Sequence, residues 1–333
     1  MDKIKMYNAD NLEVMATLTD ESIDVICIDP PYLYLKNQKL ERSFDEQKFF
    51  AECKRSLTKK GFIVLFGRGT SFYRWNTILD GLGFVFKEEV IWDKSYVSSP
   101  LMPMSRIHET VSILTKKEGV INKVKIPYLE MKKNDIDSIV TDIKRLKTTF
   151  KNTKSLNAVL EFLENNKVST DKDNVISTSI SSIIKTQDRC ASVMAGIQNG
   201  LNEKSIIRTD KGAEFKKGVS ITKGGNQLDR CVNVIQGIGF GLNEKTIIKQ
   251  VRDHYNTIHP TQKPVRLLER LLALVIPKDK PRNEIVVADF FAGSMSCMEA
   301  VHNMGMRGIA TEIDEEYFEK GKQRIESLQP LLF

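Results

Sequence analysis

The segment Asp29-Pro30-Pro31-Tyr32 carries the most distinctive chemistry of the chain. It follows the apolar run 22–28, which we expect to be a buried strand that is ended by proline. Two consecutive prolines stiffen the loop and remove two backbone donors, so the Asp29 carboxylate and the Pro30 carbonyl can act as acceptors. An exocyclic amine has two N–H donors that match them, and the Tyr32 ring offers a face on which a base can stack. The alternative is a rigid turn with a surface carboxylate.

A second chemical signal is a strand–turn–helix–strand unit over residues 284–312. Asp289 lies near the end of its first strand, a turn containing Gly293 follows, and the second strand ends at Glu312, 19 residues after Gly293. This spacing suits an acid that binds ribose hydroxyls in a nucleoside-binding fold. A dinucleotide would need three glycines beside its pyrophosphate, whereas this turn has one. The unit predicts a cofactor with a ribose and no pyrophosphate, such as S-adenosylmethionine, although a lone glycine turn is also common as a purely structural feature.

Both loops need a sheet that brings them to one edge. Before residue 116 the hydrophobic pattern predicts strands over 22–28, 61–67, 84–92 and 109–115, and helices over 44–57 and 71–82. After residue 257 it predicts strands over 283–290 and 307–313, and helices over 264–276, 294–304 and 315–327. Alternating strands and helices predict a parallel, doubly wound α/β sheet, at whose carboxyl edge ligands bind.

The positive charge of the chain is concentrated in its middle. Residues 116–256 contain 25 Lys and Arg against 16 Asp and Glu, whereas the rest of the chain contains 25 against 27. A basic segment inserted into a near-neutral frame predicts a polyanionic partner, most simply nucleic acid. The alternative is a solvated, lysine-rich surface.

The basic middle also contains an internal duplication. Residues 188–207 recur as 229–248, with 13 identities over 20 aligned positions. Two copies are too few for a solenoid. The repeats could be paired DNA-contacting elements or a purely structural duplication. Arg189 and Arg230 are equivalent in the two copies and are candidate DNA contacts, with a structural salt bridge as the alternative.

Composition excludes several classes of protein. The five cysteines form no Cys-x-x-Cys pair, so neither a disulfide framework nor a structural zinc site is expected, and a reducing cytoplasm fits. With only four His, no metal centre is expected. No stretch approaches the ~18 uninterrupted apolar residues of a transmembrane helix, and the first residues lack the apolar core of a signal peptide.

The order of these motifs resembles that of DNA amino-methyltransferases, specifically the β-class adenine-N6 methyltransferases, in which the catalytic loop precedes the cofactor loop. The resemblance covers roughly residues 1–116 and 257–333. It implies a Rossmann-like methyltransferase sheet with an inserted target-recognition domain. The first segment would form the catalytic half, residues 117–256 the basic target-recognition insert, and the last segment the cofactor-binding half.

The resemblance also implies roles for individual residues. Asp29, Pro30, Pro31 and Tyr32 match the catalytic motif. Segment 259–264 resembles the part beside the methionine moiety of the cofactor, and 8–12 resembles an element near its adenine. The candidate S-adenosylmethionine-binding residues are Asp10, Asp29, His259, Pro260, Thr261, Lys263, Asp289, Phe291, Gly293, Ser294 and Glu312. Met295 stands where the family commonly has a second glycine, which predicts a looser turn or a slightly displaced cofactor.

The function that the resemblance implies is site-specific methylation of N6 of an adenine flipped out of double-stranded DNA. A homodimer and a separate cognate restriction endonuclease are partners that such an enzyme could have. A cytosine-N4 methyltransferase is the nearest alternative, although that family more often has serine in the place of Asp29. A DNA-binding protein that has lost catalysis is the alternative from another class, and RNA or protein substrates are less favoured.

Overall fold

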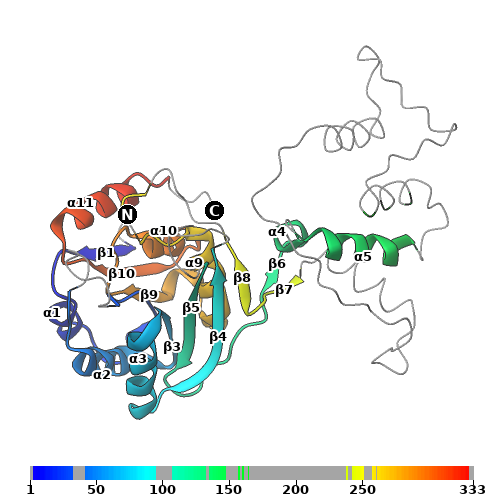
Figure 1. The fold of residues 1–333 in the computed structure, drawn as a ribbon. Helices are drawn as coiled ribbons and strands as arrows, with labels where there is room; N and C mark the ends of the chain where they lie inside the picture. Colours follow the sequence, from blue (N-terminus) through cyan, green and yellow to red (C-terminus); the bar gives the residue numbers. More distant parts are fainter. Residues whose placement is uncertain are drawn as a thin grey trace. The chain divides into compact units, whose positions relative to one another are not determined.

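The computed structural model describes residues 3–32, 42–94, 107–132, 135–147, 242–250, 257–259 and 261–329, together with residues 157, 160, 164 and 238. The chain divides into two compact units (Figure 1). One unit contains Met1–Val124 and Glu244–Phe333, and the other contains Lys125–Asn243. The first unit therefore combines both ends of the chain, and the second unit is inserted between them in the sequence.

The described part of the first unit is built on an eight-stranded sheet. In spatial order its strands are β1 (Ile4–Tyr7), β10 (Arg307–Thr311), β9 (Val286–Asp289), β2 (Ile23–Ile28), β3 (Leu57–Gly67), β5 (His108–Thr115), β4 (Val85–Asp93) and β8 (Ile247–Lys249). The first five strands in this order, from β1 to β3, are parallel to one another. The prediction of a doubly wound α/β sheet is thus confirmed, and these five strands form its parallel part.

Strand β5 departs from the parallel pattern that the sequence predicts. It runs antiparallel to both β3 and β4, whereas β4 pairs in parallel with β8. The reason is connectivity, because α3 (Gly69–Gly81) separates β3 from β4 along the chain and β5 then returns between those two strands. An antiparallel strand begins where its parallel neighbours end. The first residues of β5 therefore lie at the carboxyl edge of the sheet, where Gly67 pairs with Thr110.

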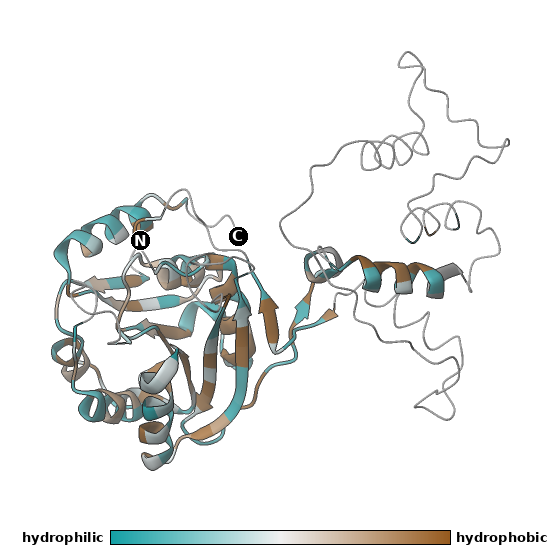
Figure 2. Ribbon diagram, in the orientation of Figure 1, coloured by the Kyte–Doolittle hydropathy of each residue, from teal (hydrophilic) through white to brown (hydrophobic). Residues whose placement is uncertain are grey.

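Helices cover both faces of the sheet (Figure 1). The helices α1 (Asn11–Ala16), α2 (Glu46–Ser56) and α3 pack on one face, and α9 (Val265–Val275), α10 (Ser296–Asn303) and α11 (Glu315–Glu326) pack on the other. Alternation along β2 explains the two cores, since Val25 and Cys27 join the α9–α10 side while Ile26 and Ile28 join the α2–α3 side. Figure 2 shows the apolar residues concentrated in the strands between more polar helices.

Aspartates begin three of these helices. The side chain of Asp10 accepts a hydrogen bond from the backbone N–H of Leu12, that of Asp45 from Lys48, and that of Asp314 from Tyr317. Each carboxylate satisfies a backbone donor that the first turn of a helix leaves without an intrahelical partner. Two of these caps, Asp10 and Asp314, follow strands of the central sheet and so fix the direction of the chain at its carboxyl edge.

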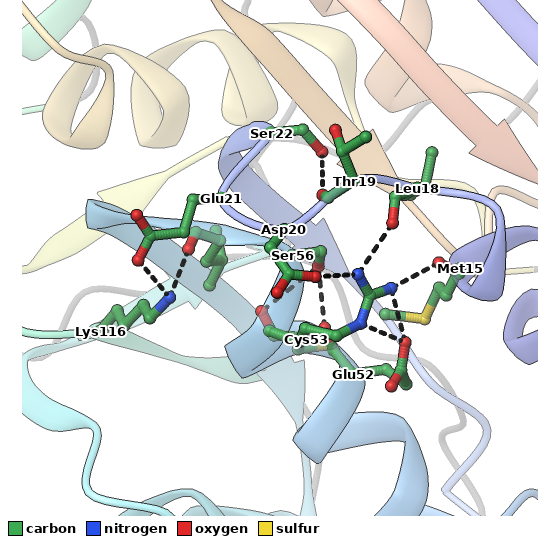
Figure 3. Close-up of polar contacts among 12 residues, drawn as sticks. Met15, Leu18, Thr19, Asp20, Glu21, Ser22, Glu52, Cys53, Ser56 and Lys116 are labelled. Atoms are coloured by element: carbon green, nitrogen blue, oxygen red, sulfur yellow. Dashed lines mark hydrogen bonds and ion pairs between the residues drawn. The ribbon is translucent and has the colours of Figure 1, made fainter.

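A polar network on α2 anchors the turn that leads into β2 (Figure 3). The Arg55 guanidinium donates to the backbone carbonyls of Met15 at 2.7 Å and Leu18 at 2.8 Å. It also contacts the carboxylates of Asp20 at 2.6 Å and Glu52 at 2.7 Å. The donors of one side chain thereby satisfy the end of α1 and hold the following turn against α2.

We expect Arg55→Met to destabilise the protein by about 2–4 kcal/mol, because two carbonyls and two carboxylates lose their donor. Urea denaturation followed by circular dichroism would measure the change in the free energy of unfolding. Lys48→Met, on the exposed side of the same helix, is the matched control. An unchanged unfolding midpoint for Arg55→Met would show that the network contributes nothing to stability.

The second unit contains the short strands β6 (Lys125–Ile126) and β7 (Leu242–Asn243), which pair antiparallel, and the helices α4 (Tyr128–Lys132) and α5 (Ile136–Lys147). Strand β8 lies within the segment 117–256 that the sequence assigned to the insert, yet it pairs with β4 because Ile247 and Ile248 complete the sheet. The candidate DNA contacts Arg189 and Arg230 lie outside the described residues. No helix in the described ranges is long and apolar enough to cross a membrane.

Candidate active site

A cavity of about 240 Å³ opens at the carboxyl edge of the sheet. Its lining includes Asp29 and Tyr32 from the loop after β2, Asp289 and Gly293 from the end of β9 and the turn after it, and Glu312 from the end of β10. The candidate catalytic and cofactor motifs, which lie in distant parts of the chain, thus share one cavity. This is the arrangement that parallel strands impose on the residues that follow them.

The loop after β2 is held by both its backbone and its side chains. The Tyr32 hydroxyl donates to Asp29 Oδ1 at 2.6 Å, and the Ser71 hydroxyl donates to the Tyr32 carbonyl at 2.6 Å. The Tyr32 ring packs against Trp75 with ring centroids 6.1 Å apart. The Lys263 ammonium forms an ion pair with Asp29 Oδ2. The carboxylate is therefore oriented before any ligand binds.

The turn after β9 is tied to the end of β10 by backbone donors. Asp289 accepts the N–H of Phe291 at 3.1 Å. Gly293 has a positive φ of 47°, and its N–H donates to Glu312 Oε2 at 2.8 Å. Glu312 Oε1 accepts the N–H of Asp314 at 2.8 Å. Both carboxylates keep further lone pairs, because each oxygen of an ionised carboxylate can accept two hydrogen bonds.

Met295 adopts the backbone conformation that a glycine would take at the same place. Its φ is 59° and its ψ is 22°, in the left-handed region that L-residues enter at a cost of about 1–2 kcal/mol. Burial of the Met295 side chain offsets this cost. The side chain fits because Gly321 of α11 faces it, and a Cβ at Gly321 would lie 2.5 Å from Met295 Cγ. The turn therefore keeps a glycine-like path without the second glycine.

The segment before α9 closes another side of the cavity. His259 Nδ1 accepts the Thr261 N–H at 3.3 Å, and the His259 ring packs edge-on against Tyr317 with centroids 4.4 Å apart. A Cβ at Gly293 would lie 3.4 Å from the His259 ring, so the histidine sits directly over the glycine turn. Pro260 lies outside the described residues.

The described candidate residues are all brought to this cavity. Besides those already placed, its lining includes Asp10, Pro30, Pro31, Phe291 and Ser294. Asp10 also caps α1, so one residue begins a helix and faces the cavity. The Ser294 hydroxyl is buried and lies 2.9 Å from that of Ser296.

The cavity has the electrostatics of a cation site. Burial raises the pKa of Asp289 to about 7; the N–H of Phe291 opposes this rise, and the nearby charges of Asp29 and Glu312 add to it. Burial also raises the pKa of Glu312. Carboxylates held together in this way ionise more readily once a positive ligand lies among them. These carboxylate acceptors therefore fit a ligand that carries positive charge and hydroxyl groups.

The raised pKa of Asp289 makes folding depend on pH. The unfolded chain ionises this group near its ordinary pKa of 3.8, whereas the folded protein resists ionisation up to about pH 7. Stability is therefore lost as the pH rises between these values. We expect Asp289→Asn to be more stable than the wild type at pH 8, by about 4 kcal/mol without ligand, and to lose this advantage toward pH 4. Urea denaturation at both pH values measures the difference, and an equal difference at both would contradict the assignment.

Glu109, at the start of β5, is a site residue that sequence reasoning missed. In the sequence the neighbouring His108 and Glu109 could suggest acid–base chemistry, with a structural hydrogen bond as the favoured interpretation. In the structure Glu109 lines the cavity and contacts Lys263 and Lys94. Burial alone would raise its pKa, but the two ammonium groups outweigh burial and lower the pKa of Glu109 to about 2. Sequence patterns do not predict this position, because a parallel β5 would place its last residues at the carboxyl edge of the sheet. The observed antiparallel β5 places its first residues there.

Comparison with known proteins identifies the family of this chain. The family model described as DNA methylase matches residues 23–323, and the chain belongs to that family. Its mixed α/β sheet is the Rossmann-like methyltransferase fold that the sequence predicts.

Individual relatives are distant. The Type II methyltransferase M.HinfI of Haemophilus influenzae is 32% identical over 112 residues, which cover 27% of this chain. The match spans only 31% of the length of that relative. The crystal structure of M1.HpyAVI is 17% identical with a TM-score of 0.50, covering 98% of this chain and 100% of that one. PvuII DNA methyltransferase (cytosine-N4-specific) is 12% identical with a TM-score of 0.50, covering 99% and 88%.

Proposed function

We propose that this DNA methylase is a site-specific methyltransferase that uses S-adenosylmethionine to methylate N6 of an adenine flipped out of double-stranded DNA. The observation that carries the proposal is the shared cavity, which is lined by the acceptor Asp29 and by the Gly293 turn with its partner Glu312. A loop with acceptors for an amine and a turn with an acceptor for a ribose meet in one place.

The cofactor fits the acid-rich cavity. When bound, S-adenosylmethionine supplies a methyl group on a sulfonium, and its ammonium adds further positive charge. Glu312 would accept hydrogen bonds from the ribose hydroxyls, and Asp289 would pair with positive charge. Of the other residues that the resemblance assigns to the cofactor, those that would hold it are Asp10, His259, Pro260, Thr261, Phe291, Gly293 and Ser294. Asp29 and Lys263 instead pair with each other.

The loop after β2 would orient the target nitrogen. Adenine N6 is a weak nucleophile because its lone pair is delocalised into the ring. Hydrogen bonds from N6 to Asp29 and to the Pro30 carbonyl favour a pyramidal nitrogen whose lone pair is free. Orientation of this kind contributes on the order of 7–11 kcal/mol in the best cases. The N6 proton leaves to Asp29 or to water.

A base inside a duplex cannot reach this loop, so the target must leave the helix. Flipping costs a few kcal/mol. Stacking on the Tyr32 ring, which lines the cavity and packs against Trp75, would return about 1–3 kcal/mol. The site thus selects a planar base with an exocyclic amine.

Adenine is favoured over cytosine because Asp29 stands where cytosine-N4 enzymes more often have serine. The test is to incubate unmodified genomic DNA with the protein and S-adenosylmethionine and then to map modified bases by sequencing. We expect N6-methyladenine at one recurring sequence. N4-methylcytosine would establish the alternative substrate, and no modified base despite normal cofactor binding would indicate an inactive DNA-binding protein.

The basic insert, residues 117–256, would be the target-recognition domain. Lys and Arg there would contact phosphates, with Arg189 and Arg230 as candidates. If about six phosphates are neutralised, DNA affinity should fall about 10³-fold between 50 and 200 mM salt. Fluorescence anisotropy of a labelled duplex measures this slope. An affinity that does not change with salt would exclude the insert as the docking surface.

A DNA methylase of this kind would work in the cytoplasm, on the chromosome or on incoming DNA. It would act either alone or beside a separate restriction endonuclease, and either as a monomer or as a homodimer.

A further inference from the structure

The Lys263 ammonium is buried between two carboxylates. It pairs with Asp29 Oδ2 on one side and lies 3.2 Å from Glu109 Oε2 on the other. Its side chain is only 9% exposed, and its Nζ lies 5.1 Å from the centroid of the Phe66 ring. A buried lysine is costly unless carboxylates surround it, so this position determines where the two acids lie.

The charges continue away from the cavity. Glu109 Oε1 accepts a hydrogen bond from the Lys94 ammonium at 3.0 Å, and both side chains are largely buried. Asp29, Lys263, Glu109 and Lys94 thus form a row of alternating charge with no net charge. Lys94 follows β4, Glu109 begins β5, and Lys263 precedes α9. Residues from three different parts of the fold therefore support the Asp29 carboxylate in the loop after β2.

The two oxygens of Asp29 have different partners. Oδ2 is held by Lys263, while Oδ1 accepts only the Tyr32 hydroxyl among the hydrogen bonds described for it. A target amine would take the place of the Tyr32 hydroxyl, a neutral donor, at Oδ1. Replacing the Lys263 ammonium at Oδ2 would instead break a buried ion pair and leave Lys263 with Glu109 alone, which is unfavourable. Oδ1 is therefore the acceptor available to the amine, and Oδ2 is the anchored one.

We propose that Lys263 is a positioning residue that orients the Asp29 carboxylate toward the target amine, that Glu109 holds Lys263 in place, and that Lys263 is not a ligand of the cofactor. This inference rests on the proposed function, and it departs from the cofactor-binding role that the sequence resemblance implies for Lys263.

The charge of Lys263 also affects when Asp29 ionises. Burial raises the pKa of Asp29, the Lys263 charge lowers it, the Glu109 charge raises it, and the Tyr32 hydroxyl lowers it. Asp289 is the other acid whose charge is felt across the cavity. Asp29 must be ionised to act as the acceptor, so its pKa sets the acid limb of the pH–rate profile. Removal of Lys263 should shift this limb to higher pH, and removal of Glu109 should shift it to lower pH.

The experiment measures single-turnover methylation of DNA against pH for the wild type, Lys263→Met, Lys263→Arg and Glu109→Gln, together with cofactor affinity by calorimetry. For Lys263→Met we expect S-adenosylmethionine affinity within about threefold of the wild type and a rate about 100-fold lower. Its acid limb should move up by about one pH unit or more. The limb should move down for Glu109→Gln and stay in place for Lys263→Arg.

Two results would overturn the inference. One is a loss of cofactor affinity in Lys263→Met with a normal rate at saturating cofactor, which would make Lys263 a cofactor ligand. The other is a slowed rate with no opposite shifts, which would reduce the row of charges to a structural element. If Lys263→Met does not fold, Glu109→Gln decides by the direction of its shift. Lys320→Met, an exposed lysine on α11, is the control.

A measurement without DNA separates this inference from the proposed function. Carbon-13 NMR of aspartate-labelled protein, assigned with Asp29→Asn, reports the titration of Asp29 directly. The pKa of Asp29 should rise in Lys263→Met and fall in Glu109→Gln even if the protein methylates no DNA. Identical titrations in all three proteins would refute the positioning role whatever the fate of the methylation assay.

Discussion

Asp29→Asn should lower the rate of DNA methylation by about 10³-fold, because the reaction loses the acceptor that orients the target amine. The substitution preserves the size of the side chain, removes its negative charge and replaces one acceptor oxygen with a donor NH₂. The Lys263 ammonium needs an oxygen, so the new amide would turn its carbonyl toward Lys263 and its NH₂ toward the target amine. A donor would then face a donor. Single-turnover assays with labelled S-adenosylmethionine at saturating cofactor and DNA measure the chemical step.

Cofactor and DNA affinity are the controls for this prediction. Both should remain close to wild-type values in Asp29→Asn, since Glu312, the Gly293 turn and the insert are untouched. Asp45→Asn, which changes the cap of α2 outside the cavity, should keep the wild-type rate. A variant at Asp29 that methylates DNA at the wild-type rate would show that the reaction takes place elsewhere.

Glu312→Gln should weaken binding of S-adenosylmethionine by about 10²-fold, because two charge-assisted hydrogen bonds to a ribose are each worth roughly 1.5–3 kcal/mol. The structure adds a second reason. Both oxygens of Glu312 accept backbone N–H groups, from Gly293 and Asp314, and an amide would turn one acceptor into a donor facing an N–H. Either the glycine turn or the start of α11 would therefore loosen.

Isothermal titration calorimetry measures this loss directly. The maximal rate at saturating cofactor should fall far less than the affinity, since Glu312 acts on binding and not on the target amine. Glu316→Gln, an exposed acid in the first turn of α11, is the matched control and should bind normally. Unchanged affinity in Glu312→Gln would remove the ribose from this end of the cavity.

Much of the fold follows from local patterns. The apolar run 22–28 followed by two prolines predicts both β2 and the end of that strand, because proline cannot continue a central strand. The turn with Gly293 and the acid Glu312 are predictable for a similar reason, since function at a parallel edge follows the ends of strands. The meeting of Asp29 and Glu312 in one cavity is therefore foreseeable from the sequence.

Long-range charge pairing is not predictable in this way. The antiparallel direction of β5 depends on how a strand returns between β3 and β4, which no local pattern encodes, and Glu109 reaches the cavity only through it. The Lys263 contact with Asp29 joins segments that the sequence treats as separate motifs. The glycine-like conformation of Met295 depends on Gly321 in a distant helix. Each of these features arises from tertiary packing.

The most direct test of the account is a crystal structure of the protein with S-adenosylmethionine. We expect the ribose of the cofactor to lie beside Glu312 and its ammonium group to lie near Asp289. Its sulfonium should face the loop of Asp29 and Tyr32. Lys263 should still contact Asp29 rather than the cofactor. A cofactor bound away from this cavity, or with its sulfonium turned from Asp29, would contradict the central claim.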